Sequence, residues 1–277
     1  MNKTYTHLRP DLDAICSAWV ARSFLLRDSQ IIFVNANWDG EGMKPGDMAV
    51  DIEAGGRGVK GKRGLDGHVH SAFRTLAEQY LSDEDREALA PLIRFVDETD
   101  MYGAVVRRFL PDAPNHVVGM FNGTNLIAVL EALRTSCKGD DAALCDAMFS
   151  ILNGMLANGR ARIRARKSAD ECWRTGCGRV AIMENMPHAV ADVLFGRGVR
   201  VIVYVDGNNI GIYRGKKETV RMDDPRIRKV VDDAGELSEW FIHSSGFLFC
   251  RGSRKAPVAA PSLVVPRDLA LAAAEVL

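Results

Sequence analysis

The sequence predicts an α/β protein with two domains. Short apolar runs of the kind that form strands alternate with helical patterns through the first hundred residues, and this rhythm is typical of a mostly parallel sheet flanked by helices. A long helical stretch follows at 140–168, and strand patterns return after Gly176. We therefore expect an N-terminal α/β domain over 1–168 and a second, smaller α/β domain over 169–277.

The expected elements of the N-terminal domain follow from residue type and spacing. Runs rich in β-branched and aromatic residues predict strands at 3–8, 31–34 and 48–52. Apolar residues at helical spacing predict helices, the first of them amphipathic, at 13–27, 71–81, 83–97, 124–136 and 140–168. Ser82 is expected to cap the helix that it precedes, whose first turn is acidic.

The C-terminal domain is predicted to contain a hairpin. Strand patterns lie at 179–183, 199–205 and 210–214. The segment Asp206-Gly-Asn-Asn209 between the last two strands is a strong hairpin turn signal. A helix over 224–235 and an apolar segment over 240–250 complete the domain.

Composition excludes several classes of protein. The 277 residues are 47% hydrophobic and 26% charged, as in soluble globular proteins, and the net charge of +0 does not indicate a polyanionic partner. No apolar run reaches the length of a membrane span, so no membrane partner is expected. The six cysteines form no Cys-x-x-Cys pair, which predicts reduced thiols and a cytoplasmic location.

One imidazole and two carboxylates lie close together near the N-terminus, at His7, Asp11 and Asp13. On a strand that runs into a turn these side chains can converge, and Asp51 follows another strand whose end meets the same edge of the sheet. Histidine with aspartate suits a divalent metal such as Mn²⁺. Taken alone, the segment favours a stiff turn in which Asp11 or Asp13 caps the next helix, and only the clusters that follow it favour a metal site.

Two further clusters follow, at Asp66-Gly-His-Val-His70 and Asp97-Glu-Thr-Asp100. The order His-x-x-Pro-Asp-x-Asp, lone Asp, Asp-x-His-x-His and Asp resembles that of the DHH phosphoesterase superfamily. Near the other end, the segment 239–247 reads Glu-Trp-Phe-Ile-His-Ser-Ser-Gly-Phe. It resembles the His-Ala-Ser-Gly-Phe segment of the melanocyte-proliferating-gene-type hydrolases, a DHH-related branch associated with exonucleolytic cleavage of RNA. The stretch from 105 to 235 is matched only loosely.

The resemblance implies an N-terminal site for two divalent ions, with Mn²⁺ preferred over Mg²⁺, that supports displacement at phosphorus. The implied metal ligands are His7, Asp11, Asp13, Asp51, His68 and Asp100. Asp51 would bridge the ions and His70 would face the phosphate, so these two are the implied catalytic residues. The residues by themselves leave the choice between Asp97 and Asp100 open.

The third cluster departs from the family pattern of adjacent histidines, because Gly67 and Val69 are inserted. Alternate residues of an extended strand share a face, so Asp66, His68 and His70 could still point the same way. Three consequences are open: a metal site with altered geometry, one ion instead of two, or loss of activity.

The C-terminal segment offers groups that bind phosphate. The expected substrate-binding residues are His243, Ser245, Gly246, Arg251 and Arg254. The serine hydroxyl and the glycine N–H would donate to phosphate oxygens, and arginine suits bidentate phosphate capture. This segment would form a clamp that faces the metals across a cleft between the domains. The alternative is an exposed basic loop.

Together these features predict a metal-dependent phosphodiesterase, an exonuclease acting on single-stranded RNA or a short oligonucleotide. One alternative is a phosphohydrolase for a small substrate, namely a nucleotide, a cyclic dinucleotide or polyphosphate. Another is a non-catalytic relative with a degraded third cluster. A purely structural protein ranks last, and the sequence leaves a homodimer open.

Overall fold

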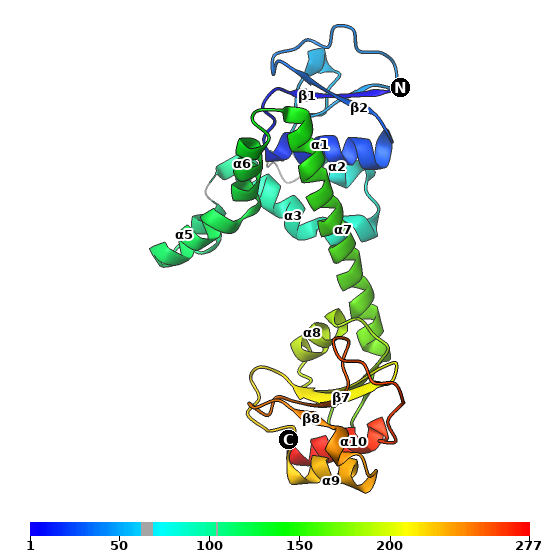
Figure 1. Ribbon diagram of the computed structural model, residues 1–277. Coiled ribbons are helices and arrows are strands. Elements are labelled where there is room, and N and C mark those ends of the chain that lie inside the picture. The colour runs from blue at the N-terminus through cyan, green and yellow to red at the C-terminus, as the bar shows by residue number, and fades with distance from the viewer. Residues whose placement is uncertain (62–68, 104) are drawn as a thin grey trace. The chain divides into compact units, whose positions relative to one another are not determined.

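A computed structural model describes residues 1–61, 69–103 and 105–277, and of Val105 it describes the backbone. It confirms the α/β class (Figure 1). The chain divides into two compact units, Met1–Arg160 and Ala161–Leu277. The division falls inside helix α7 (Asp141–Glu171), somewhat before the boundary predicted at 168/169.

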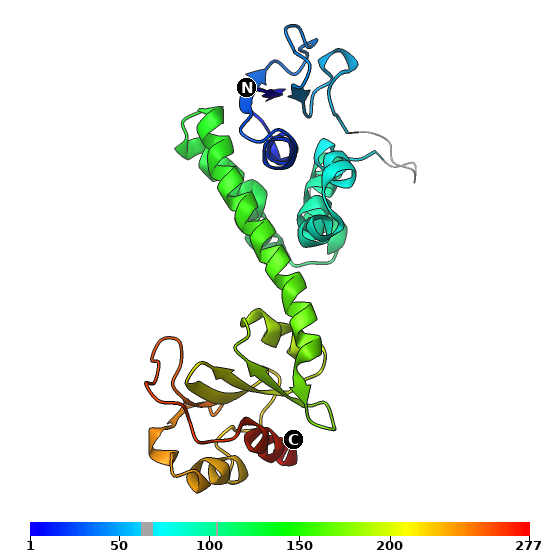
Figure 2. The same ribbon diagram turned by 90° about the vertical axis from the view of Figure 1, so that its right-hand side faces the viewer.

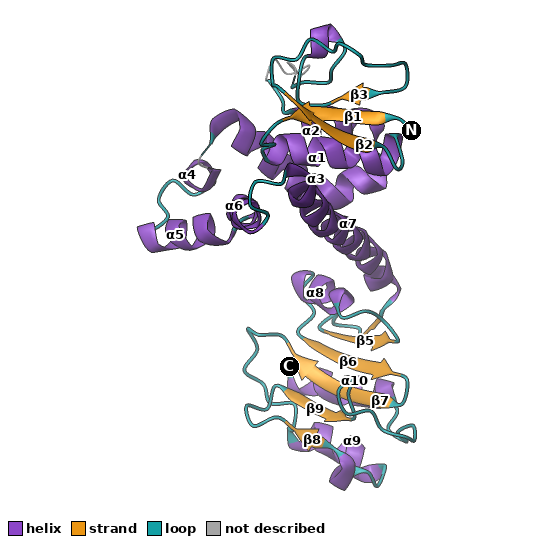
Figure 3. Ribbon diagram, turned by 45° about the horizontal axis from the view of Figure 1, so that its top comes forward, coloured by secondary structure: helices purple, strands orange, loops and turns teal. Residues whose placement is uncertain are grey.

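The N-terminal unit contains a parallel sheet in the order β2-β1-β3 (Figure 3). Its strands are β1 (Lys3–His7), β2 (Gln30–Val34) and β3 (Met48–Ala49). The strand predicted at 48–52 ends early because Asp51 takes a left-handed conformation with a φ of 55°, which no regular strand accommodates. The carboxyl ends of β1 and β3 meet at one edge, and His7 and Asp51 lie there.

The helix predicted over 13–27 begins as α1 (Leu12–Val20), but α1 is buried on every side, so the prediction that it is amphipathic was wrong. A helix that is apolar all round belongs in a core. One side of α1 faces the sheet, and the other packs on α2 (Ala72–Tyr80), α3 (Asp83–Tyr102) and α7. Figure 2 shows α1 end-on between these layers. The chain continues as a π-helical turn over Ala21–Leu25.

Short helices connect α3 to α7 in the N-terminal unit. They are α4 (Val105–Phe109), α5 (Asn115–Thr124) and α6 (Leu126–Ser136). None of the ten residues of α5 is buried, and its two glycines weaken the helical pattern, which explains why this helix was not predicted. Among the described helices none is long and apolar enough alone to cross a membrane, although α5 and α6, bent by 48°, pass that test as a pair.

The C-terminal unit has a mixed sheet in the order β4-β5-β6-β7-β9-β8. The strands are β4 (Trp173–Arg174), β5 (Val180–Glu184), β6 (Val201–Asp206), β7 (Asn209–Arg214), β8 (Phe241–Ile242) and β9 (Leu248–Arg251). Strands β5 and β6 are parallel, and β6 and β7 form the predicted hairpin.

Helices cover both faces of this sheet (Figures 1 and 3). They are α8 (Ala189–Gly196) on one face, and α9 (Pro225–Asp233) and α10 (Pro266–Val276) on the other. Alternate residues of β5 separate accordingly: Val180 and Ile182 pack with the α9 and α10 residues, whereas Ala181 and Met183 pack with those of α8.

Helices α3 and α7 approach closely at Gly159. A Cβ at this position would lie 2.3 Å from the carbonyl oxygen of Ala88, a backbone atom that cannot rotate away. Gly154, in the same helix, has nothing within 4 Å of its ideal Cβ. The close packing of α3 on α7 therefore requires glycine at position 159 but not at position 154.

We predict that Gly159→Ala lowers the free energy of unfolding of the protein by about 2–3 kcal/mol, as overpacked cores do. Gly154→Ala, the matched control, should raise it by about 0.5–1 kcal/mol because alanine favours the helix. Urea unfolding followed by circular dichroism measures both. Equal effects of the two substitutions would contradict the close packing of α3 on α7.

Candidate metal centre

His7, Asp11 and Asp51 converge at the carboxyl edge of the N-terminal sheet, as predicted. One ligand atom from each lies within 4.8 Å of the others. The Nε2 atom of His7 is 3.3 Å from a carboxylate oxygen of Asp51, and that hydrogen bond raises the pKa of His7 to about 9. The backbone at Asp51 is left-handed, with a φ of 55°, and such sparsely populated conformations cluster at functional sites.

Asp11 combines the two roles considered from the sequence. One of its carboxylate oxygens accepts the backbone N–H of Ala14 at 3.0 Å, so it caps α1. Its side chain is also a member of the His7–Asp11–Asp51 group. The cap fixes the carboxylate at the end of the helix, and the capping and ligand interpretations are therefore compatible.

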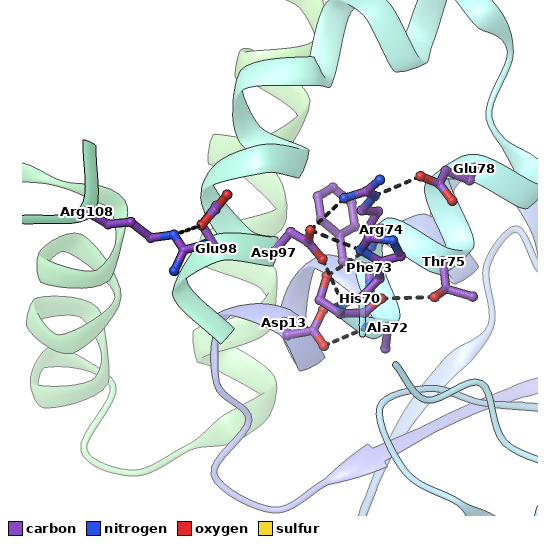
Figure 4. Close-up of polar contacts among 11 residues, drawn as sticks. Asp13, His70, Ala72, Phe73, Arg74, Thr75, Glu78, Asp97, Glu98 and Arg108 are labelled. Atoms are coloured by element: carbon purple, nitrogen blue, oxygen red, sulfur yellow. Dashed lines mark hydrogen bonds and ion pairs between the residues drawn. The ribbon is translucent and has the colours of Figure 1, made fainter. Parts of the chain in front are cut away.

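Asp13 is buried and anchors the start of α2. Its two carboxylate oxygens accept the backbone N–H groups of Ala72 and Phe73 at 2.9 and 2.7 Å (Figure 4). Burial, followed by the negative charge of Asp51, raises the pKa of Asp13 to about 8 despite these hydrogen bonds. Asp13 thus lies within electrostatic range of the metal-ligand group while it also holds a helix in place.

The structure separates the roles of Asp97 and Asp100. Asp97 accepts from the backbone N–H of Ser71 at 2.8 Å and from the Arg74 guanidinium at 2.9 Å, so it is committed to local structure (Figure 4). Burial and the charges of Asp51 and Asp11 raise the pKa of Asp100 to about 6. Asp100 lines one pocket with Asp11 and Asp13, so it is the one of the two aspartates that lies near the group, and its role as a ligand stays a prediction.

His70 lies beside Asp97, and Asp97 orients its ring. Its Nδ1 atom is 3.4 Å from an Asp97 carboxylate oxygen, and its side chain is buried (Figure 4). Histidines at metal sites are commonly oriented by such a carboxylate. The other members of the third cluster, Asp66 and the expected ligand His68, fall outside the described residues.

A pocket of about 260 Å³ opens beside the carboxylates, and Asp11, Asp13 and Asp100 line it. Thr99 and Arg134 line it as well, and sequence analysis did not select them. The Oγ1 atom of Thr99 and the Nε atom of Arg134 are buried and lack a hydrogen-bond partner among the described residues. Unpaired buried polar atoms are costly, and these two belong to residues that line the pocket.

Arg134 is attached to the loop that carries the ligands. One of its guanidinium nitrogens donates to the Pro10 carbonyl at 2.8 Å, and another pairs with Glu131 at 2.9 Å. No sequence signal could have selected this arginine, because it comes from α6, more than a hundred residues after the first cluster. Only the packing of α6 onto the rest of the unit brings it there.

Two expected substrate-binding groups in the C-terminal unit are engaged within a turn. The Gly246 N–H donates to the His243 carbonyl at 2.7 Å, so the expectation that it is available to a phosphate was wrong. The Nδ1 atom of His243 accepts from the Ser245 N–H at 3.2 Å and lies 3.0 Å from the Ser245 hydroxyl. The His243 and Ser245 side chains remain partly or fully exposed.

The two expected arginines differ in environment. Arg251 is buried and donates to Glu239 at 2.7 Å and to the Ala260 carbonyl at 2.7 Å, so it holds the domain together and its expected role in substrate binding was wrong. Arg254 is exposed and pairs with Asp206 at 2.7 Å. Of the two, Arg254 is the one placed to meet a ligand.

We predict that the metal-free protein loses stability as pH rises from about 4 toward 9. Folding raises the pKa of Asp100 to about 6, of Asp13 to about 8 and of His7 to about 9. A group with a raised pKa contributes stability below its unfolded pKa and loses that contribution as pH rises through the folded value. Thermal melting in EDTA across this range measures the slope.

Asp100→Asn should weaken this dependence between about pH 4 and 6. The Asp100 side chain is solvent-exposed, so the effect of its charge on stability is small. At pH 8 we expect the variant to be about 1 kcal/mol more stable than wild type, which raises its melting temperature by ~2–4 °C. At pH 4 the two proteins should be equally stable. Asp112→Asn, an exposed aspartate on the turn before α5, is the control. A variant with an unchanged slope would contradict the placement of Asp100 near the other carboxylates.

Comparison with known proteins identifies no family. No family model matches the chain, and no curated protein matches it. Among solved structures it is similar to an uncharacterized protein from Helicobacter pylori G27, with 11% sequence identity over 100% of this chain and 99% of that chain, and a TM-score of 0.24. A likeness at this level supports no argument about function, so the functional conclusion depends on the chemistry of the site.

Proposed function

We propose that the N-terminal unit binds divalent metal, Mn²⁺ in preference to Mg²⁺, and hydrolyses phosphodiesters in RNA or short oligonucleotides. The observation that carries this proposal is the convergence of His7, Asp11 and Asp51 within 4.8 Å at a sheet edge. The nature of the bond cleaved comes from the resemblance of the four clusters to the DHH phosphoesterases. The exonuclease activity and the cytoplasmic location are proposals on the same basis.

The donor set fits a hard or borderline cation. One imidazole nitrogen and several carboxylate oxygens are the ligands that Mn²⁺ accepts, whereas the group contains no thiolate that would favour a softer metal. Asp13 and Asp100 lie close by, and burial, followed by the charge of Asp51, raises the pKa of both in the absence of a cation, so a bound cation would favour their ionised forms. The nearby cation Lys60 offsets only part of this cost at Asp51 and Asp100.

The chain's own residues would position the substrate and its protons. A bound divalent ion would supply Lewis acidity toward phosphoryl oxygens and lower the pKa of water. The Arg134 guanidinium, whose side chain is 23% exposed, would donate to phosphate oxygens in the pocket of about 260 Å³. Asp97 would hold the His70 ring in one orientation, and a role of His70 in proton transfer comes from the resemblance alone.

The alternatives make different predictions about turnover. A phosphohydrolase for nucleotides, cyclic dinucleotides or polyphosphate would use the same metal site and reject longer oligonucleotides. A non-catalytic relative would bind metal without turnover. Assays with labelled single-stranded RNA of several lengths, beside these small substrates, separate the three cases.

We predict that Mn²⁺ stabilises the full-length protein. At a concentration a hundredfold above the dissociation constant, the gain should be about 2.7 kcal/mol, which raises the melting temperature by several degrees. Asp51→Asn should abolish this gain and reduce hydrolysis at least a hundredfold, whereas Asp112→Asn should do neither. A protein that Mn²⁺ does not stabilise, or in which Asp51→Asn behaves like wild type, would contradict the metal site.

Arg134→Gln tests the substrate pocket separately from the metal. It should lower kcat/KM by about 10- to 100-fold, since a charge-assisted hydrogen bond to phosphate is lost, and keep the stabilisation by Mn²⁺. Arg86→Gln, at a partly exposed arginine on α3 that pairs with Asp83, is the control and should retain the activity. Equal activities of the arginine variant and wild type would exclude Arg134 from substrate binding.

A further inference from the structure

The C-terminal unit contains a second pocket, of about 290 Å³, at the carboxyl ends of β5 and β6. These strands form the parallel pair of the sheet, and ligands of α/β proteins commonly bind beyond the carboxyl ends of parallel strands. The pocket is mostly apolar. Its size is at the lower end of the range for small-molecule sites and suits one ring system better than an extended polymer.

Aromatic rings form much of its lining. The rings of Tyr204 and Tyr213 have centroids 5.9 Å apart and are tilted by 58° to each other. The His188 ring stacks on that of Tyr213, with centroids 6.3 Å apart and an interplanar angle of 19°. Gly211 makes room for this arrangement, because a Cβ there would lie 2.6 Å from a ring carbon of Tyr204. Phe247, the last residue of the segment 239–247, adds a further ring.

The pocket is held open by contacts within the protein. Asn185, just after β5, takes a left-handed φ of 52°, and its side-chain oxygen accepts the Gly207 N–H from the β6–β7 turn at 2.9 Å. The Tyr204 hydroxyl donates to the Gly252 carbonyl at 3.2 Å. The two loops around the pocket are therefore tied to each other and to the sheet, so a ligand would enter a preformed site.

The rim carries one exposed ion pair, between Arg254 and Asp206. The Arg254 side chain is 69% exposed, and an anion could therefore compete for its guanidinium at little cost. Asp206 would then accept hydrogen bonds from a neutral N–H or O–H donor. An aromatic floor beside one arginine and one carboxylate is complementary to a flat heterocycle that bears a phosphate.

We propose that this pocket binds the base of a nucleotide, with the ring against the tyrosines and His188 and the phosphate toward Arg254. Stacking of bases on aromatic side chains tolerates any base, because every base has a π-face. The proposal deepens the proposed function and rests on it for the identity of the substrate. It selects base-bearing substrates, nucleotides or oligonucleotides, over inorganic polyphosphate.

The test is calorimetric titration of the full-length protein in EDTA with AMP, ribose 5-phosphate and pyrophosphate. We expect AMP to bind at least 10-fold more tightly than the two compounds that lack a base. His188→Ala and Phe247→Ala, both at exposed side chains where folding is not at risk, should each weaken AMP binding about 10-fold. Arg254→Gln should weaken the binding of AMP more than the binding of adenosine, which is titrated as well and lacks the phosphate. Tyr80→Leu, an exposed tyrosine on α2, is the control.

Failure of this proposal is distinguishable from failure of the metal site. Asp51→Asn should leave AMP binding in EDTA unchanged, because the pocket lies wholly in the C-terminal unit. Equal binding of AMP and ribose 5-phosphate, or retention of AMP affinity in both His188→Ala and Phe247→Ala, would overturn the base pocket even if the protein hydrolyses phosphodiesters. Binding of a long-chain fatty acid in preference to AMP would overturn it in favour of an aliphatic ligand.

Discussion

Crowding of carboxylates at one edge of a small parallel sheet is the constraint on which the N-terminal unit depends. Asp11, Asp13, Asp51 and Asp100 lie close together there, and burial, followed by the charges of neighbouring carboxylates, raises the pKa of three of them. Proteins retain such costly arrangements where function uses them. A bound cation would be ligated by these carboxylates and would offset the repulsion between them. Metal binding would therefore stabilise the folded N-terminal unit.

The same side chains also build the fold. Asp11 caps α1, and Asp13 receives the first N–H groups of α2, so the two helices are oriented by residues of the candidate site. Asp97 fixes the entry to α2 and orients His70. Movement of any of these carboxylates would therefore shift helices as well as ligands, which is how a site becomes preorganised.

Local patterns in the sequence predicted the strands and helices that carry the site, and the ends of β1 and β3 correctly indicated where His7 and Asp51 meet. What sequence could not give depends on tertiary packing. The burial of α1 on all sides, the arrival of Arg134 from α6 and the engagement of Arg251 with Glu239 come from contacts between distant segments. The Gly246 amide was assigned to a ligand because a turn within the segment was not foreseen.

The most direct test of the central claim is anomalous diffraction from crystals grown with Mn²⁺. The account predicts a manganese peak bonded to the Nε2 atom of His7 and to carboxylate oxygens of Asp11 and Asp51, and loss of that peak in Asp51→Asn crystals. A wild-type crystal that is saturated with Mn²⁺ and shows no peak between these three residues would contradict it.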